Sequence, residues 1–304
     1  MTKELFLAYP HGFCAGVKRA VSILEKCLEK YKSPIFVNHE IVHNQYLVDY
    51  FKEKGVQFDV PLEKIPQGSL YIFSAHGVSP DFREQCHERG LRVIDATCPL
   101  VLKVHREAEI YSKKGYKIIF IGQKQHQECK GTSGVAEMQI IEKLTDIKKI
   151  TPENYEKQKV ICLCQTTMSL DDTEEIILAL KEKIPHLEII KDICYASQNR
   201  QKAVKEIAPQ CDFIIVLGSK NSSNSNSLVE TARKHGSQAE LFENLDNFPE
   251  DIFEYEKIGI TAGASVPENL YKKATKIFQE KNPQMKINTI TVAEEKLNFP
   301  LPLI

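Results

Sequence analysis

The sequence lacks several features that would each indicate a particular class of protein. Its formal net charge is only −1 over 304 residues, and this lack of a basic excess argues against nucleic acid or an acidic membrane as a partner. The apolar run near the N-terminus is too short for a signal peptide, and no stretch is long enough to span a bilayer. We therefore expect a cytoplasmic protein with no nucleic-acid partner and no membrane insertion.

Three familiar motifs are also missing. The sequence has no G-x-x-x-x-G-K-[ST] and no G-x-G-x-x-G, so it does not signal a nucleotide cofactor. It has no C-x2-C pair, the spacing that structural zinc sites usually show. Cys162 and Cys164 form only a C-x-C within an apolar run, and we expect both to be packed strand residues.

Cysteine, by contrast, is abundant, with nine residues in the chain. An odd number scattered over so long a chain does not indicate a disulfide framework. The remaining interpretations are metal or cluster ligation, thiolate chemistry, and simple burial in the core, where unpaired cysteine is common. Cys27, Cys86 and Cys211 have no unusual sequence context, so we expect them to be structural.

Short apolar runs alternate with helical patterns along the chain. Examples of these runs are LFLAY, IFVN, LYIFS, LRVID, KIIFI, VICLC, LEIIK, FIIVLG and IGITA. This alternation predicts an α/β fold with mostly parallel sheets.

Three of the cysteines share one local pattern. Cys14, Cys98 and Cys194 each follow an apolar, strand-like run and each precede a stretch with helical periodicity. About 28 residues after each cysteine, another strand-like run ends in a polar tip, and a second such tip follows later. The first tips carry His43, His126 and Ser222, and the second tips carry His76, Thr166 and Ser265.

The repeated order predicts three similar α/β domains arranged pseudo-symmetrically around a common point. Ligands of open α/β sheets bind beyond the carboxyl ends of the strands, where all six tips lie. The expected domains are residues 10–97, 98–193 and 194–283, the last joined by the N-terminal strand 1–9, with a C-terminal strand and tail at 284–304.

Three converging thiolates would suit zinc, copper(I) or an iron–sulfur cluster. A cubane cluster normally takes four cysteines, so three would leave one iron open to act on a substrate as a Lewis acid. The tips supply neutral donors near helix starts, which suit the oxygens of a small phosphorylated molecule. Each feature also has a simpler interpretation: NSSNSN as a solvated loop, a single histidine as a structural residue, and Glu128 as a surface carboxylate. Cys129, at a tip, is a rival ligand.

The motifs together resemble the 4-hydroxy-3-methylbut-2-enyl diphosphate reductase (LytB/IspH) family. They span residues 12–265 in the family's order: GFCAGV, EIVHN, SAHGV, DATCPLV, QTT, DICYA, GSKNSSNSN and TAGAS. The resemblance implies three similar α/β domains around one iron–sulfur cluster. It also implies a cytosolic enzyme at the last step of the non-mevalonate (MEP) isoprenoid pathway.

The resemblance also implies roles for individual residues. Cys14, Cys98 and Cys194 would hold a 4Fe-4S cluster with one open iron. Glu128, Thr166 and His126 would be the catalytic residues, with Glu128 supplying protons at the substrate hydroxyl. The diphosphate and the rest of the substrate would be bound by His43, His76, His126, Thr166, Ser222, Ser223, Asn224 and Ser265.

The implied reaction is a two-electron reductive removal of the hydroxyl of (E)-4-hydroxy-3-methylbut-2-enyl diphosphate. Its products would be isopentenyl and dimethylallyl diphosphates, and a ferredoxin or flavodoxin would supply the electrons. Two alternatives stay open at this point. One is a hydro-lyase that uses an open cluster iron without electrons, and the other is a structural zinc module or an electron carrier that uses the thiols alone.

The chain departs from the family pattern mainly in one loop. The family usually reads G-H-x-x-H-P-E-V, whereas this chain reads GQKQHQEC. Gln123 stands in place of a histidine, Gln127 in place of a proline and Cys129 in place of a valine. His11 stands where the family often has an arginine. These changes bear on the placement of the proton donor more than on the type of reaction.

Overall fold

The computed structural model describes residues 2–304, which form two compact units. The first unit contains residues 2–15, 43–45 and 194–297, and the second contains residues 16–42, 46–193 and 298–304. The chain therefore passes between the units several times, and the last seven residues belong to the second unit. Among the described residues, no helix is long and apolar enough to cross a membrane.

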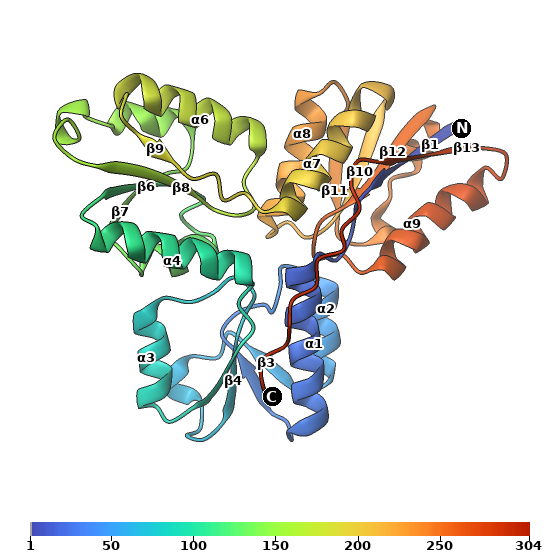
Figure 1. The fold of residues 1–304 in the computed structure, drawn as a ribbon. Helices are drawn as coiled ribbons and strands as arrows, with labels where there is room; N and C mark the ends of the chain where they lie inside the picture. Colours follow the sequence, from blue (N-terminus) through green and yellow to red (C-terminus); the bar gives the residue numbers. More distant parts are fainter. Residues whose placement is uncertain (1) are drawn as a thin grey trace. The chain divides into compact units, whose positions relative to one another are not determined.

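The helices and strands alternate along the chain, as Figure 1 shows. The helices are α1 (Ala15–Lys30), α2 (Gln45–Glu53), α3 (Pro80–Glu88), α4 (Pro99–Lys113), α5 (Gln127–Ser133), α6 (Leu170–Lys183), α7 (Tyr195–Ile207), α8 (Ser223–Lys234) and α9 (Glu268–Lys281). The strands are β1 (Glu4–Tyr9), β2 (Ile35–Val37), β3 (Val56–Phe58), β4 (Leu70–Phe73), β5 (Arg92–Asp95), β6 (Lys117–Ile121), β7 (Met138–Ile141), β8 (Val160–Cys164), β9 (Glu188–Ile189), β10 (Phe213–Leu217), β11 (Gln238–Phe242), β12 (Lys257–Ala262) and β13 (Lys286–Thr291).

The strands form three parallel sheets with one repeated order. The N-terminal sheet has the order β3-β2-β4-β5, the middle sheet β7-β6-β8-β9, and the C-terminal sheet β11-β10-β12-β1-β13. In each sheet the fourth strand leads directly to one of the three marker cysteines: β5 to Cys98, β9 to Cys194 and β1 to Cys14. The predicted α/β fold with parallel sheets and threefold repetition is confirmed.

The polar tips occupy equivalent places in the three sheets. His43, His126 and Ser222 follow the second strands β2, β6 and β10. The tips with His76, Thr166 and Ser265 follow the third strands β4, β8 and β12. The equal spacing seen in the sequence therefore reflects equal strand positions.

The C-terminal sheet is covered by helices on both faces, as the period-2 alternation of its buried side chains requires. On one face Leu5, Ile215 and Ile260 pack against Tyr271 and Phe278 of α9. The opposite face, which includes Phe6, Ile214 and Val216, packs against α7 and α8.

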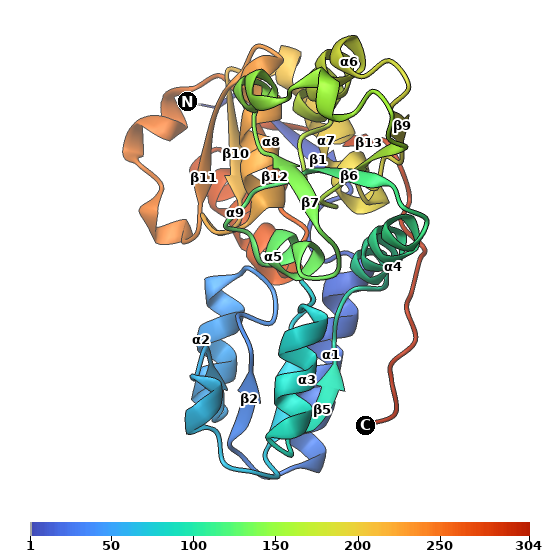
Figure 2. The same ribbon diagram turned by 90° about the vertical axis from the view of Figure 1, so that its left-hand side faces the viewer.

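The middle sheet has the same layered construction within the second unit. One face carries Cys162 and Cys164, which are fully buried and pack with α6, so the prediction that both are strand core residues is confirmed. The other face packs against α4 and α5 (Figure 2). Cys27, Cys86 and Cys211 are also buried, as expected.

Four strands, β3, β7, β11 and β13, were not among the apolar runs that the sequence analysis singled out, although a C-terminal strand was expected where β13 lies. The other three were not predicted. Each is the edge strand that pairs with the second strand of its sheet. Their sequences, VQF, MQII and QAELF, mix polar with apolar residues. The exposed positions in these strands carry polar residues, so no continuous apolar run was present to reveal them.

Candidate active site

The three marker cysteines differ from the other six in their exposure. Cys14, Cys98 and Cys194 are half-buried, whereas every other cysteine is buried, and none of the nine is in a disulfide. Each marker cysteine directly precedes a helix: α1, α4 or α7. A thiolate is favoured at a helix N-terminus by the backbone dipole. These three residues are therefore the accessible thiols from which a ligand set can be built.

In the first unit, a chain of hydrogen bonds joins the two cysteine-bearing segments. The backbone N–H of Cys14 donates to the carbonyl of Ala264 at 3.1 Å, and the N–H of Ala264 donates to Oδ1 of Asn224 at 2.8 Å. Nδ2 of Asn224 donates to Oγ of Ser197 at 3.3 Å, whose backbone N–H donates to Sγ of Cys194 at 3.3 Å. The structure thus brings Asn224, a predicted substrate ligand, into contact with both cysteine segments.

Tyr195 lies within electrostatic reach of both thiols. Burial, followed by the sulfur atoms of Cys14 and Cys194, raises the pKa of Tyr195 to about 12. The phenol is therefore neutral at physiological pH. It was not among the predicted site residues, although it directly follows Cys194 in the sequence.

The serines that were predicted to bind the substrate also lie in the first unit. Ser265 donates its hydroxyl to the carbonyl of His43 at 2.8 Å, which connects two predicted site residues that are far apart in the sequence. Ser222 caps α8 by accepting the N–H of Ser225. Ser223 is the first residue of that helix and is buried, as is Asn224.

The backbone before Cys14 needs glycine at one position. Gly12 has φ of +67°, and a Cβ added there would lie 3.0 Å from the carbonyl oxygen of Val266. Any L-residue would therefore be strained and crowded. His11, where the family often has arginine, stacks on Tyr271 with ring centroids 3.4 Å apart.

In the second unit, the Cys98 turn lies against the turn that carries His76. The N–H of Cys98 donates to the carbonyl of Ala75 at 3.0 Å, the residue before His76. The imidazoles of His76 and His126 lie edge to face with centroids 5.6 Å apart. Two predicted diphosphate ligands from different sheets are therefore neighbours.

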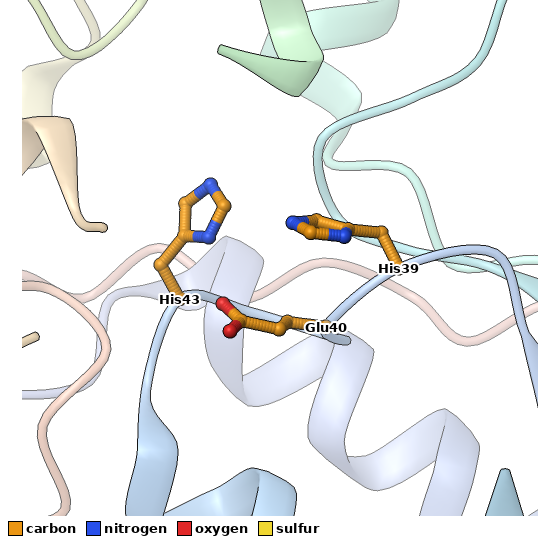
Figure 3. A group of neighbouring side chains, drawn as sticks. All are labelled: His39, Glu40 and His43. Carbon is orange, nitrogen blue, oxygen red and sulfur yellow. The ribbon is translucent and has the colours of Figure 1, made fainter. Parts of the chain in front are cut away.

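The loop between β2 and α2 carries three polar side chains, His39, Glu40 and His43 (Figure 3). His39 lies 6.2 Å from His76, measured between ring centroids, and its Nδ1 is 2.9 Å from Oδ1 of Asp59. His39 was not predicted as a site residue. Its position four residues before His43 in the same tip was the available signal.

Glu128 is held by one residue of the neighbouring loop. Its carboxylate oxygens accept the backbone N–H of Thr166 at 2.7 Å and the Thr166 hydroxyl at 2.8 Å. The N–H of Glu128 in turn donates to Nδ1 of His126 at 3.2 Å, which caps α5. The structure thus brings together the three residues predicted to be catalytic.

The environment of Glu128 changes its acidity. The side chain is only 2% exposed, and this burial raises its pKa to about 7, although the two hydrogen bonds from Thr166 act in the opposite direction. A carboxyl group with such a pKa carries a proton over much of the neutral range and can donate it. The interpretation of Glu128 as a solvated surface carboxylate is therefore wrong.

Sequence reasoning missed a second buried carboxylate near Glu128. Asp192 raises the pKa of Glu128, and burial raises the pKa of Asp192 itself to about 7. Nζ of Lys103 lies 2.7 Å from Oδ1 of Asp192 and 3.2 Å from Oε1 of Glu107. Asp192 stands two residues before Cys194, which was its only signal in the sequence.

The loop that departs from the family pattern is anchored by Gln165. Its Oε1 accepts the N–H of Gln123 at 2.9 Å, and its Nε2 donates to Thr167 at 3.0 Å. Gln127 is the first residue of α5. Cys129 is fully buried against Phe120 and other core residues, and burial raises the pKa of its thiol to about 11. A protonated core thiol is a poor metal ligand, so the structure disfavours Cys129 as a rival ligand.

These features define a class: α/β proteins of three similar parallel sheets, with a cysteine-capped helix after the fourth strand of each. Comparison with known proteins identifies a family for this chain. The sequence profile of the family described as "LytB protein" matches residues 5–279. The chain belongs to the LytB family.

Relatives and solved structures extend this match over the whole chain. A protein of Burkholderia mallei named 4-hydroxy-3-methylbut-2-enyl diphosphate reductase 2 is 45% identical, over 98% of this chain and 92% of its own length. A 4-hydroxy-3-methylbut-2-enyl diphosphate reductase of Chlamydia trachomatis is 44% identical, over 99% of both chains. The structure of the E-1-hydroxy-2-methyl-but-2-enyl-4-diphosphate reductase from Plasmodium falciparum superimposes with a TM-score of 0.95 at 37% identity, covering 99% of this chain and 96% of that one.

Proposed function

We propose that this chain is a reductase that removes the hydroxyl group of (E)-4-hydroxy-3-methylbut-2-enyl diphosphate. Full-length relatives at 44–45% identity carry the name of this enzyme, and one similar structure is described as the terminal enzyme of the non-mevalonate pathway. The products are isopentenyl and dimethylallyl diphosphates. The reaction consumes two electrons and two protons, breaks the C–O bond, forms a C–H bond and releases water.

The donor set fits an iron–sulfur cluster with three protein ligands. The half-buried thiols of Cys14, Cys98 and Cys194 sit at helix starts that favour thiolates, while the remaining six are buried. A 4Fe-4S cluster held by these three would supply one iron without a protein ligand and a route for single electrons. A ferredoxin or flavodoxin is the proposed electron donor. A cytoplasmic location suits this chemistry, because a reducing compartment keeps nine cysteines as thiols.

The polar tips are the proposed substrate site. The family resemblance makes these residues the donors for the diphosphate: His43, His76, His126, Ser222, Ser223, Asn224 and Ser265. Charge-assisted hydrogen bonds to phosphate oxygens would fix the position of the allylic end.

Glu128 is the proposed proton donor, and the observation that carries this role is its burial beside Thr166. Its pKa of about 7 keeps a proton available where a solvated glutamic acid would have lost it. Thr166 holds the carboxyl group in one orientation through two hydrogen bonds. Protonation of the departing hydroxyl group turns a poor leaving group into water.

The first test is to purify the protein without oxygen and to count iron and acid-labile sulfide per chain. We expect about four of each in the wild type, and a strong depletion in Cys14→Ser. The control is Cys129→Ala, which removes the buried rival thiol and should keep the iron. Zinc in place of iron, or iron that does not respond to Cys14→Ser, would contradict the proposal.

Reductant dependence then separates the proposed reaction from that of a hydro-lyase. With a reduced viologen dye, the wild type should convert the substrate to the two diphosphate products. Without reductant, we expect no more product than the electrons already stored in the enzyme can form. Catalytic turnover without any electron source would instead support the hydro-lyase alternative.

A further inference from the structure

The last part of the chain contacts two arginines, and each arginine holds backbone beside a marker cysteine. In the first unit, Arg200 of α7 is completely buried. Its Nη2 donates to the carbonyl of Gly12 at 2.7 Å, and its Nη1 donates to the carbonyl of Ala196 at 2.9 Å. Gly12 lies two residues before Cys14, and α7 begins directly after Cys194. Arg200 therefore ties the two cysteine-bearing segments of this unit together.

Glu295 completes this arrangement from beyond β13. Its two carboxylate oxygens lie 3.0 and 3.2 Å from Nη1 and Nη2 of Arg200, and Oε1 also accepts from Asn199 at 3.2 Å. The paired contacts hold the planar guanidinium in one orientation, which a lysine could not reproduce. The carboxylate also compensates a charge that is buried inside the unit.

A similar arrangement occurs in the second unit around Arg19 of α1. Its Nη1 donates to the carbonyl of Thr97 at 3.0 Å, and its Nη2 donates to the carbonyl of Asp95 at 3.4 Å. Thr97 directly precedes Cys98. Nε of Arg19 donates to the carbonyl of Pro300 at 2.9 Å. The guanidinium thus joins the Cys98 turn to the C-terminal tail.

The tail continues beside α1 after Pro300. Nζ of Lys30, in the last turn of α1, contacts the backbone oxygen of Ile304. Figure 1 and Figure 2 both show the end of the chain within the second unit near α1. Residues 298–304 form no helix or strand, so side-chain contacts rather than a ladder of hydrogen bonds fix their course.

We propose that residues 294–304 form a strap that positions the cysteine-bearing turns, through Arg200 for Cys14 and Cys194 and through Arg19 for Cys98. This inference rests on the proposed role of the three cysteines as cluster ligands. A cluster bound by these thiolates would be retained only while their turns stay in place, because a turn that moved away would expose an iron–sulfur bond to solvent. The strap restricts that movement by holding the carbonyl groups next to the ligands.

The test uses two truncations that differ by four residues. A chain that ends at Leu297 lacks the Pro300 carbonyl, whereas a chain that ends at Leu301 keeps it as a peptide carbonyl and loses the contact between Lys30 and Ile304. The measurement is the rate at which the anaerobically loaded protein releases iron to a chelator. We expect the chain ending at Leu297 to release iron about tenfold faster, in line with the loss of one or two hydrogen bonds. The chain ending at Leu301 should release iron nearly as slowly as the full chain does.

Arg19→Gln identifies the route of the effect. If the tail acts through Arg19, the variant should release iron at least as fast as the chain ending at Leu297, because it also loses the bonds to Thr97 and Asp95. The combination should then be no faster than Arg19→Gln alone. Rates that multiply in the combination would overturn this route, and an unchanged rate in the Leu297 truncation would overturn the strap itself. In the first unit the matched change is Glu295→Asp, which keeps the charge but withdraws the carboxylate by one methylene. It should also speed iron release.

Hydrogen exchange of the iron-free protein separates this inference from the proposed function. Truncation at Leu297 should reduce the protection of the Cys98 amide, whatever the metal content. If the full chain binds no iron, or keeps its iron in Cys98→Ser, the cluster assignment fails. Protection that does not change on truncation, in a protein whose iron depends on Cys98, would reject the strap alone.

Discussion

Thr166 and Glu128 show how two side chains set the acidity of one carboxyl group. Burial favours the neutral form of Glu128, and the hydrogen bonds from Thr166 favour the charged form. Burial dominates, so the pKa lies at about 7 rather than 4.5. The balance depends on a contact between residues 38 positions apart in the chain.

This shift makes stability depend on pH with a definite sign. Between pH 4.5 and 7 the unfolded carboxyl group has lost its proton, while the folded one keeps it. The unfolded state therefore binds fewer protons, and the free energy of unfolding falls as the pH rises, by roughly 3 kcal/mol in all. Above pH 7 the contribution of Glu128 is constant.

Glu128→Gln should remove that dependence. Between pH 5 and 8, urea unfolding of the iron-free variant should show a smaller loss of stability than the wild type. Turnover should fall by about 10²- to 10⁴-fold, because the proton donor is gone. The iron content of the variant should not change. Glu109→Gln, which removes an exposed carboxylate paired with Lys113, is the control and should alter neither quantity. Parallel pH curves for Glu128→Gln and the wild type would contradict the assignment.

At the scale of elements, the loops after β6 and β8 are joined by Gln165. This side chain is fully buried, and it satisfies the N–H of Gln123, which lies 42 residues earlier in the chain. The departures from the family pattern fall in this same loop. Its course is therefore held from the neighbouring loop rather than by the proline that the family usually has.

Gln165→Leu should remove the acceptor of the Gln123 N–H, which lies in a partly exposed loop. We expect a loss of about 0.5–1.5 kcal/mol in the free energy of unfolding, measured with urea, and faster hydrogen exchange in residues 122–126. Thr167→Val removes the hydroxyl that accepts from the Gln165 amide and leaves the bond from Gln123 to Gln165 in place. Because Thr167 is half-exposed, water can replace it, and this change should cost less. Equal losses of stability in the two variants would show that the hydrogen bond to Gln123 contributes no more than the one to Thr167.

At the scale of the whole molecule, the first unit depends on a strand from the opposite end of the sequence. β1 lies between β12 and β13, and its Leu5 is completely buried beside Ile258 and Ile260. The unit thus cannot complete its sheet until β1 meets β12 and β13, which are synthesised much later. Closing so long a loop costs conformational entropy, and the packing of the buried strands must offset that cost.

Leu5→Ala should therefore destabilise the first unit by roughly 2–5 kcal/mol. Hydrogen exchange should increase most in β10 and β12, while β4 and β6 of the second unit keep more of their protection. Leu24→Ala is the matched control, because Leu24 is equally buried in α1 of the second unit, and it should show the reverse pattern. Uniform loss of protection in both variants would mean that the two units unfold together.

Much of the fold could be predicted because it is encoded locally. Apolar runs, helix periodicity and the residues beside Cys14, Cys98 and Cys194 depend on near neighbours in the chain, so they can be seen in the sequence. The edge strands β3, β7 and β11 could not be seen so easily, because partial exposure leaves them only a weak hydrophobic pattern. The exact domain boundaries and the assignment of ligands to a common centre remain predictions.

The sequence by itself determined the α/β class, the threefold repetition and the candidate ligands, because periodicity and repeated motifs are properties of the linear chain. Only the tertiary structure decided which cysteines are half-exposed and that Cys129 is buried. It also decided that Glu128 carries a raised pKa, and that Arg200 and Arg19 are met by Glu295 and Pro300. These properties depend on burial and on contacts between distant residues. Neither exists until the chain has folded.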